Sequence, residues 1–184
     1  MRYSSEQKAE TRSRLLSSAA KATKRAGLVS ASVDAIAAAA GITGAGVYHH
    51  FPSKQDLFAA VVAQELESSL LTRLSRSPDF DIDELLTGLG QYLSAEHLRN
   101  VEGGCPVPAM CVDIAHADEP VKQGFETWME ELHRSWAEVL GSSSLARGAI
   151  SQCIGALLIA RMMSGEELQQ QVLHENLLDL RDRL

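Results

Sequence analysis

Apolar residues recur every three or four positions along most of this chain, and no stretch alternates apolar and polar residues for long enough to form a strand. The longest repeat is Phe58, Val62, Leu66, Leu70 and Leu74, which places its apolar side chains on one face of a helix. The pattern predicts an all-helical (all-α) protein. We expect about nine helices, over residues 6–26, 33–40, 44–50, 54–77, 82–98, 106–117, 119–140, 145–163 and 166–181.

Helix start and stop signals divide the first third of the chain into short helices. Ser32, Thr43 and Ser53 are good N-caps, and Asp56 follows Ser53 at the position where an acid can return the hydrogen bond. Gly41 ends the second helix and permits the positive φ of a sharp turn. Two short helices joined by a glycine-containing turn have the proportions of a helix-turn-helix, whose second helix enters the DNA major groove.

Charge is unevenly distributed along the chain. Residues 1–60 hold eight Lys and Arg against four Asp and Glu, a net charge of +4, whereas residues 61–184 hold nine against twenty, a net charge of −11. A basic segment on an acidic body favours contact of that segment with a polyanion, because neutralised phosphates supply most non-specific nucleic-acid affinity. The alternative is a solvated helix face without a partner.

Composition excludes several classes of protein. The longest apolar run, residues 153–160, is far shorter than the ~20 residues of a membrane span, and the polar N-terminus has no apolar core of a secretory signal. The three cysteines have no metal-ligand spacing and fit reduced thiols. We expect a cytoplasmic protein with no membrane segment, no metal and no cofactor.

Residues 11–58 resemble the DNA-binding domain of TetR-type (TetR/AcrR) transcriptional regulators. The family pattern joins a first helix that ends in glycine, a helix-turn-helix, and a Y-x-x-F-x-x-K-x-x-L exit, which here is Tyr48, Phe51, Lys54 and Leu57. The resemblance implies a three-helix DNA-binding domain over residues 1–53, followed by a helical effector-binding and dimerisation domain over residues 54–184. It also implies a homodimeric one-component repressor that a small-molecule effector releases from a near-palindromic double-stranded DNA operator.

The expected DNA contacts lie in and around the recognition helix. A tyrosine hydroxyl can reach phosphate, and a lysine at a helix start adds its ammonium group to the free N–H groups there. The helix itself, read as Gly44 to Val47, has little hydrogen-bonding capacity, which predicts modest sequence specificity with weight on phosphate contacts and DNA shape. The expected contacts are Ser32, Thr43, Gly44, Ala45, Val47, Tyr48, His49 and Lys54.

The acidic two-thirds carries a predicted dimer interface and a predicted effector pocket. Apolar stripes on the last two helices, with small residues between them, favour a four-helix interface; part of each stripe also belongs to the core of the chain. Methionines and two tryptophans suggest a pocket for an apolar effector. The interface residues are Ile150, Ile154, Leu157, Leu158, Arg161, Leu173, Leu177 and Leu180. The pocket candidates are Tyr92, Met110, Phe125, Trp128, Met129, His133, Trp136 and Met162.

Cys105 is a candidate redox or electrophile sensor, because a helix start after two glycines would lower the thiol pKa. The alternative is a small buried hydrophobe. Two other functions compete with the regulator. An enzyme would pair Cys105 with His97 or His116, yet no orienting group accompanies them. A protein-interaction adaptor would explain a recognition helix so poor in polar side chains.

Overall fold

The computed structural model describes residues 5–184, and all the regular structure of these residues is helical. This confirms the all-α prediction. The helices are α1 (Ser5–Ser30), α2 (Val33–Ala39), α3 (Gly44–Val47), α4 (Lys54–Glu67), α5 (Leu70–Ser75), α6 (Ile82–Tyr92), α7 (Ala95–Arg99), α8 (Pro106–Ala115), α9 (Glu119–Leu140), α10 (Ser143–Met162) and α11 (Glu166–Arg183). Residues 1–4, the start of the predicted DNA-binding domain 1–53, lie outside the described residues.

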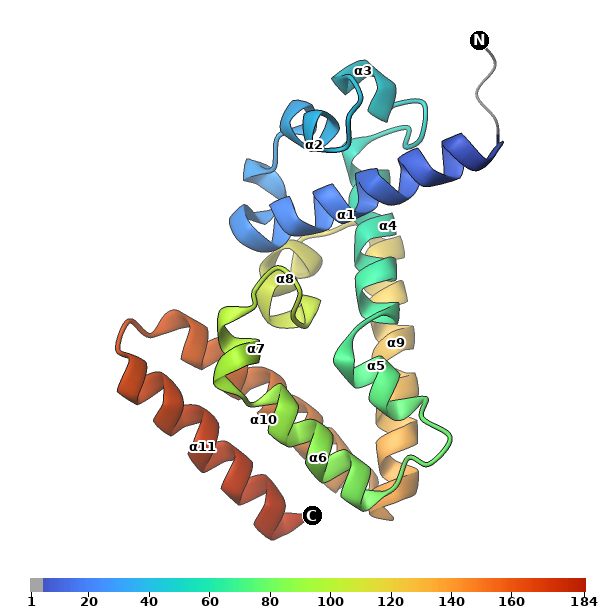
Figure 1. The fold of residues 1–184 in the computed structure, drawn as a ribbon. Helices are drawn as coiled ribbons and strands as arrows, with labels where there is room; N and C mark the ends of the chain where they lie inside the picture. The colour runs from blue at the N-terminus through green and yellow to red at the C-terminus, as the bar shows by residue number, and fades with distance from the viewer. Residues whose placement is uncertain (1–4) are drawn as a thin grey trace.

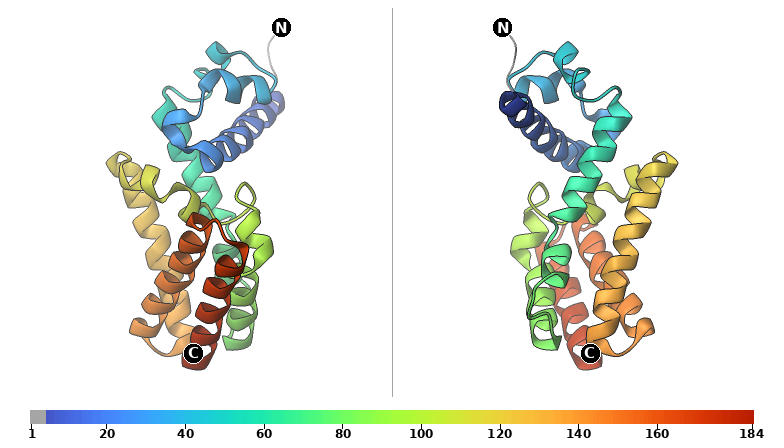
Figure 2. Two further views of the ribbon diagram at one scale, coloured as in Figure 1. Left: turned by 90° about the vertical axis from the view of Figure 1, so that its left-hand side faces the viewer. Right: turned by 90° about the vertical axis from the view of Figure 1, so that its right-hand side faces the viewer.

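The molecule consists of a small head and a larger helical body (Figure 1). Helices α1, α2 and α3 form the head, and α4 leads from the head into the body alongside α9. The remaining helices pack below the head, and the C-terminus lies at the opposite end of the molecule (Figure 2). The head therefore touches the body mainly through α1 and α4, and through the contact of α1 with α8.

Caps predicted from the sequence build the head. The hydroxyl of Ser32 accepts a hydrogen bond from the Ala35 amide, and that of Thr43 accepts one from the Gly46 amide at 3.2 Å. Gly41 turns the chain between α2 and α3 with a φ of 76°. Helix α3 ends at Val47, so the residues up to position 50, expected to be helical, form turns instead.

Two of the long helices expected from the sequence are each broken, which gives eleven helices among residues 5–184 rather than nine. The helix expected over residues 54–77 stops at Glu67, and Ser69 caps a new one by accepting from the Thr72 amide at 3.2 Å. The helix expected over residues 82–98 stops at Tyr92, and Ser94 caps α7. Serine hydroxyls offer the backbone a cap in place of the next helical turn, so apolar spacing alone overestimated both lengths.

Helices α9 and α10 form the centre of the body. Two buried tryptophans of α9 hold α5 in place: Trp128 Nε1 donates to the Thr72 hydroxyl at 2.8 Å, and Trp136 Nε1 donates to the Ser75 hydroxyl at 3.0 Å. Helix α10 is long and apolar enough to cross a membrane by length and composition alone. It packs against both α9 and α11, so its apolar character matches the central helix of a bundle.

Candidate DNA-binding site and effector pocket

The exit of α3 is surrounded by cationic side chains from α1. Arg12 lies over the ring of Phe51, with its guanidinium carbon 4.8 Å from the ring centroid. The pKa of His50 is lowered first by burial and then by the charges of Lys8, His49 and Arg12. Sequence analysis missed Lys8 and Arg12 as candidate DNA contacts. The available signal was that both belong to the basic first third of the sequence; the structure places them on α1, exposed on either side of the buried Thr11.

The predicted DNA contacts differ in accessibility. Tyr48 is 53% exposed, and Ala45 and His49 are also exposed. Val47, expected to face DNA, is only 2% exposed and packs in the core of the head, so that expectation is corrected. Its position follows from helical geometry, since the side of α3 opposite Ala45 must bury an apolar residue against α1 and α2.

Other predicted contacts have structural partners in the head. Lys54 Nζ donates to the Val29 carbonyl at 3.3 Å and so joins the start of α4 to the end of α1. Ser53 caps α4 as predicted: the Asp56 amide donates to the Ser53 hydroxyl at 3.0 Å, and that hydroxyl donates to the Asp56 carboxylate at 2.7 Å. A Cβ on Gly44 would lie 2.0 Å from Asp34 Oδ1, so the exposed Asp34 side chain would have to turn away to admit one.

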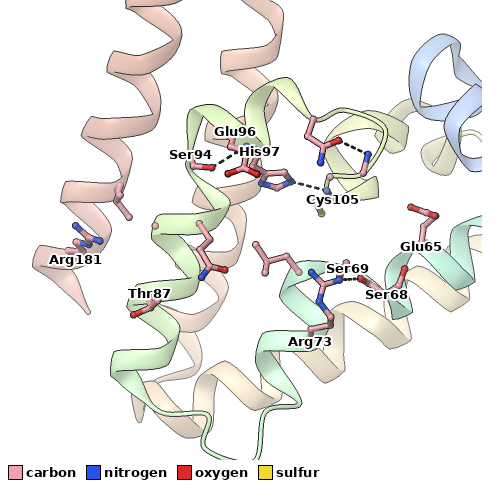
Figure 3. A pocket seen from close by; sticks show the side chains of 17 residues that line it. Glu65, Ser68, Ser69, Arg73, Thr87, Ser94, Glu96, His97, Cys105 and Arg181 are labelled. Atoms are coloured by element: carbon pink, nitrogen blue, oxygen red, sulfur yellow. Dashed lines mark hydrogen bonds between the residues drawn. The ribbon is translucent and has the colours of Figure 1, made fainter.

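A pocket of about 890 Å³ lies in the body and not among the predicted effector residues. Figure 3 shows it between α4 and α5 on one side, α6 and α7 on the other, with the loop before α8 at its inner end. Most of the residues that line it are polar or charged. The residues that line it include Glu65, Arg73, Gln91, His97, Gly104 and Cys105.

None of the eight predicted effector residues lines this pocket. Trp136 and Tyr92 are fully buried in the core, whereas Met162 is 71% exposed on α10. Trp128 lines a smaller pocket of about 280 Å³ beside α4. Of the other four, Met110 is buried in the core and Met129 packs on it. Phe125 lies against Trp128, and His133 contacts the Ser143 carbonyl. The structure therefore does not bring the eight residues together.

His97 and Cys105 meet at the inner end of the large pocket. The Cys105 amide donates to His97 Nε2 at 2.9 Å, so the proton of the ring sits on Nδ1 and is donated to the Tyr92 carbonyl at 2.7 Å. Both ring nitrogens are thus used in the neutral form. Burial lowers the pKa of His97, consistent with a neutral ring that organises the loop before α8.

The surroundings of Cys105 contradict the expectation of a lowered thiol pKa. The residue is the N-cap of α8 but is only 1% exposed, and burial raises its pKa. Loss of solvation outweighs the helix dipole at this position. Nearby, two guanidinium nitrogens of Arg161 are buried without a hydrogen-bond partner, and the Tyr92 hydroxyl and the Arg161 charge each lower the pKa of the Cys105 thiol without offsetting its burial.

Half of the predicted dimer interface lies in the core of the chain. Ile150, Leu157, Leu173 and Leu180 are at most 3% exposed without any second subunit, so they are corrected to core residues. Ile154, Leu158 and Leu177 are partly buried, and Arg161 donates to the His97 carbonyl at 3.1 Å. The apolar residues that α10 and α11 do expose are Ile159, Met162, Leu168 and Leu178.

The head matches a known family in sequence as well as in shape. The sequence pattern described as "Bacterial regulatory proteins, tetR family" matches residues 15–61, which hold most of α1, all of α2 and α3, and half of α4. This chain carries a TetR-family domain. Its helix-turn-helix is the DNA-binding element of TetR-family transcriptional regulators, and the match includes Tyr48, Phe51, Lys54 and Leu57 of the predicted exit pattern.

Solved structures resemble the TetR-type head and body together. The reduced form of NemR from E. coli has a TM-score of 0.78 at 16% identity and covers 94% of this chain and 95% of its own. A TetR regulator from Chloroflexus aurantiacus has a TM-score of 0.76 at 17% identity, covering 96% of both chains. SCO4454 from Streptomyces coelicolor has a TM-score of 0.71 at 22% identity, covering 95% and 96%. No curated protein sequence matches the chain significantly.

Proposed function

We propose that this chain is a DNA-binding transcriptional repressor that acts as a homodimer, with residues 1–53 reading DNA and residues 54–184 binding an effector and a second subunit. The observation that carries the proposal is a helix-turn-helix that matches the TetR family, with Tyr48 exposed at the end of α3 and Arg12 of α1 over Phe51 at the same exit. Phosphates on either side of a major groove are the ligands that such a grouping accepts.

We expect this head to distinguish DNA sequences with only modest specificity. With Val47 in the core and the Thr43 hydroxyl bonded to the Gly46 amide, Ala45 and His49 remain as the side chains free to meet base edges. Alanine offers only an apolar contact to a thymine methyl group. Phosphate contacts and the shape of the DNA therefore supply most of the affinity.

The proposed dimer interface uses the outer faces of α10 and α11. Ile159 and Met162 on α10 and Leu178 on α11 are apolar and 45–71% exposed, which is costly for a surface without a partner. The small Gly155 on α10 has open space around its Cα, so a second helix can approach closely there. Pairing these helices with their copies gives a closed, two-fold interface that matches the two halves of a near-palindromic operator.

The effector is proposed to enter the large pocket beside α4. The sequence suggested an apolar or thiol-reactive molecule. Many of the lining residues can form hydrogen bonds, which favours an effector with polar groups beside an apolar part, while Cys105 at the inner end is the position that a thiol-reactive effector would meet after entering. Because burial raises the pKa of Cys105, such a reaction would require the pocket to open first.

The proposal is tested by measuring how salt affects binding to an operator fragment. The wild type is expected to show a steep fall in affinity with salt, and replacing Arg12 with Ala is expected to reduce the slope of log K against log[salt] by about 1, because one phosphate contact is lost. Glu126→Ala on α9 provides a control far from the head. Equal slopes for wild type, Arg12→Ala and Lys8→Ala would contradict the proposed interface and favour a protein-interaction adaptor.

A further inference from the structure

Lys24 is the one lysine of α1 whose side chain is buried among the described residues, at 1% exposure. Its ammonium group forms an ion pair with Glu65 of α4. It also donates to the Glu102 carbonyl at 3.0 Å and to the Gly104 carbonyl at 2.8 Å, both in the loop before α8. A single head residue therefore joins three segments: the last third of α1, the last turn of α4 and the loop before α8.

Two of the partners of Lys24 belong to the wall of the large pocket. Glu65 and Gly104 both line it, and Figure 3 shows Glu65 facing the pocket near the loop that holds Cys105. The Glu65 side chain is 17% exposed, so one carboxylate oxygen serves Lys24 while the group remains accessible from the pocket. A molecule in the pocket thus meets the same carboxylate and the same loop that hold the ammonium group.

The residues that follow Lys24 connect its contacts with α4 and the loop before α8 to the helix-turn-helix. Just after Lys24, the chain leaves α-helical geometry at Gly27, and the Leu28 amide donates to Asp113 of α8 at 3.1 Å. The segment that follows leads directly into α2 of the helix-turn-helix. A change in the position of Lys24 relative to α4 and the loop therefore changes the angle at which the head leaves the body.

We propose that Lys24 is the positioning residue that couples the large pocket to the DNA-reading head: occupation of the pocket pulls Glu65 or the 102–104 loop away from Lys24 and releases the end of α1. The inference rests on the proposed function, since it assigns a regulatory route to the same pocket and the same head. A buried ammonium group that loses its carboxylate is strongly destabilised, so the two arrangements are discrete rather than continuous.

The coupling is tested first in the free protein, by amide hydrogen exchange. Lys24→Met keeps the aliphatic stem and removes all three polar contacts, and Glu65→Gln removes only the charge. Both variants are expected to exchange about tenfold faster or more at amides 28–31 and 101–105, within the range typical of coupling between sites. Arg25→Ala is the matched control, because Arg25 pairs with Glu102 of the same loop at the surface. Unchanged exchange in both variants would overturn the proposal.

The route from the pocket is tested with a substitution that fills the pocket in place of an effector. Gln91 lies exposed on the α6 wall, so Gln91→Trp adds bulk inside, and Gln91→Ala serves as its control. Gln91→Trp is expected to weaken binding of the protein to its selected operator about tenfold, and to have no further effect in a Lys24→Met background. An equal loss in both backgrounds would contradict the route through Lys24. Failure of the wild type to bind any operator would instead contradict the proposed function and leave the exchange experiment decisive for the coupling.

Discussion

At the residue scale, the two glycines of α3 have different surroundings. A Cβ on Gly44 would collide with the carboxylate of Asp34, whereas a Cβ on Gly46 would meet Ile42 and Thr43 at 3.4 Å, an ordinary contact distance. A side chain at the first position therefore displaces the exposed Asp34 carboxylate. The second only lowers the helix propensity of the recognition helix.

Gly46→Ala is therefore expected to stabilise the head by about 0.5–1 kcal/mol and to leave operator binding intact or tighter, because alanine favours helix over glycine. Gly44→Ala is expected to stabilise it less, since the exposed Asp34 carboxylate must first turn away. Urea unfolding of both variants measures the difference. Equal free energies of unfolding for the two would show that the close approach of Asp34 does not matter.

His97 makes stability depend on pH in a defined direction. Burial lowers its folded-state pKa below 6.5, so the unfolded chain binds more protons as the pH falls through 6.5. The free energy of unfolding is expected to be highest above that pH and to fall on acidification, by at most about 1.4 kcal/mol per pH unit for one group. His50, whose pKa is also lowered by burial, contributes in the same direction.

Urea unfolding between pH 5 and about pH 7.5 tests this dependence. His97→Asn is expected to flatten the slope relative to wild type, whatever its effect on stability at neutral pH. His116→Gln, at an exposed position after α8, is the control. A slope unchanged by His97→Asn would mean that the ring is not neutral in the folded protein.

At the element scale, the sequence was most informative where a helix start has a polar cap. Ser32, Thr43 and Ser53 all cap helices as predicted, because a hydroxyl before an apolar pattern has one favourable use. The same rule applied to Ser69 and Ser94 would have located both missed breaks. In both places the apolar residues continue at helical spacing across the break, so that spacing alone did not reveal it.

The pocket was less predictable than the helices. Its wall comes from segments separated by more than a hundred positions, such as Glu65 and Arg181, and no local pattern brings these together. Aromatic residues and methionines were natural candidates for a binding site, but tryptophans with bonded N–H groups stabilise the core instead. Burial of Cys105 likewise depends on tertiary packing beside His97 and Tyr92, which spacing does not reveal.

Ser69→Ala is expected to lower the free energy of unfolding by about 1 kcal/mol, because it removes the N-cap of α5 and a buried hydrogen bond to Thr72. Ser68→Ala, one residue earlier and exposed, is the control and should change stability by less than about 0.5 kcal/mol. Chemical denaturation measures both. A loss no larger than that of Ser68→Ala would show that the break between α4 and α5 does not depend on this cap.

At the scale of the whole molecule, the chain combines a TetR-family head with a body whose last two helices expose apolar residues. Ile159→Asp is expected to convert the dimer to a monomer, with a loss of about 2 kcal/mol or more of association free energy, as for the burial of an unpaired charge at an interface. Val112→Asp, exposed on α8, is the control. Sedimentation equilibrium measures the change. A stable Ile159→Asp dimer would place the interface elsewhere.

The central claim is that a dimer of this chain reads a near-palindromic DNA site. It is tested most directly by selecting fragments of the source genome with the purified protein and measuring how their binding depends on salt. We expect a single near-palindromic site, bound by one dimer with a steep salt slope. Binding no tighter than to random duplex would contradict the claim and would mean that α3, with its two glycines, no longer reads sequence.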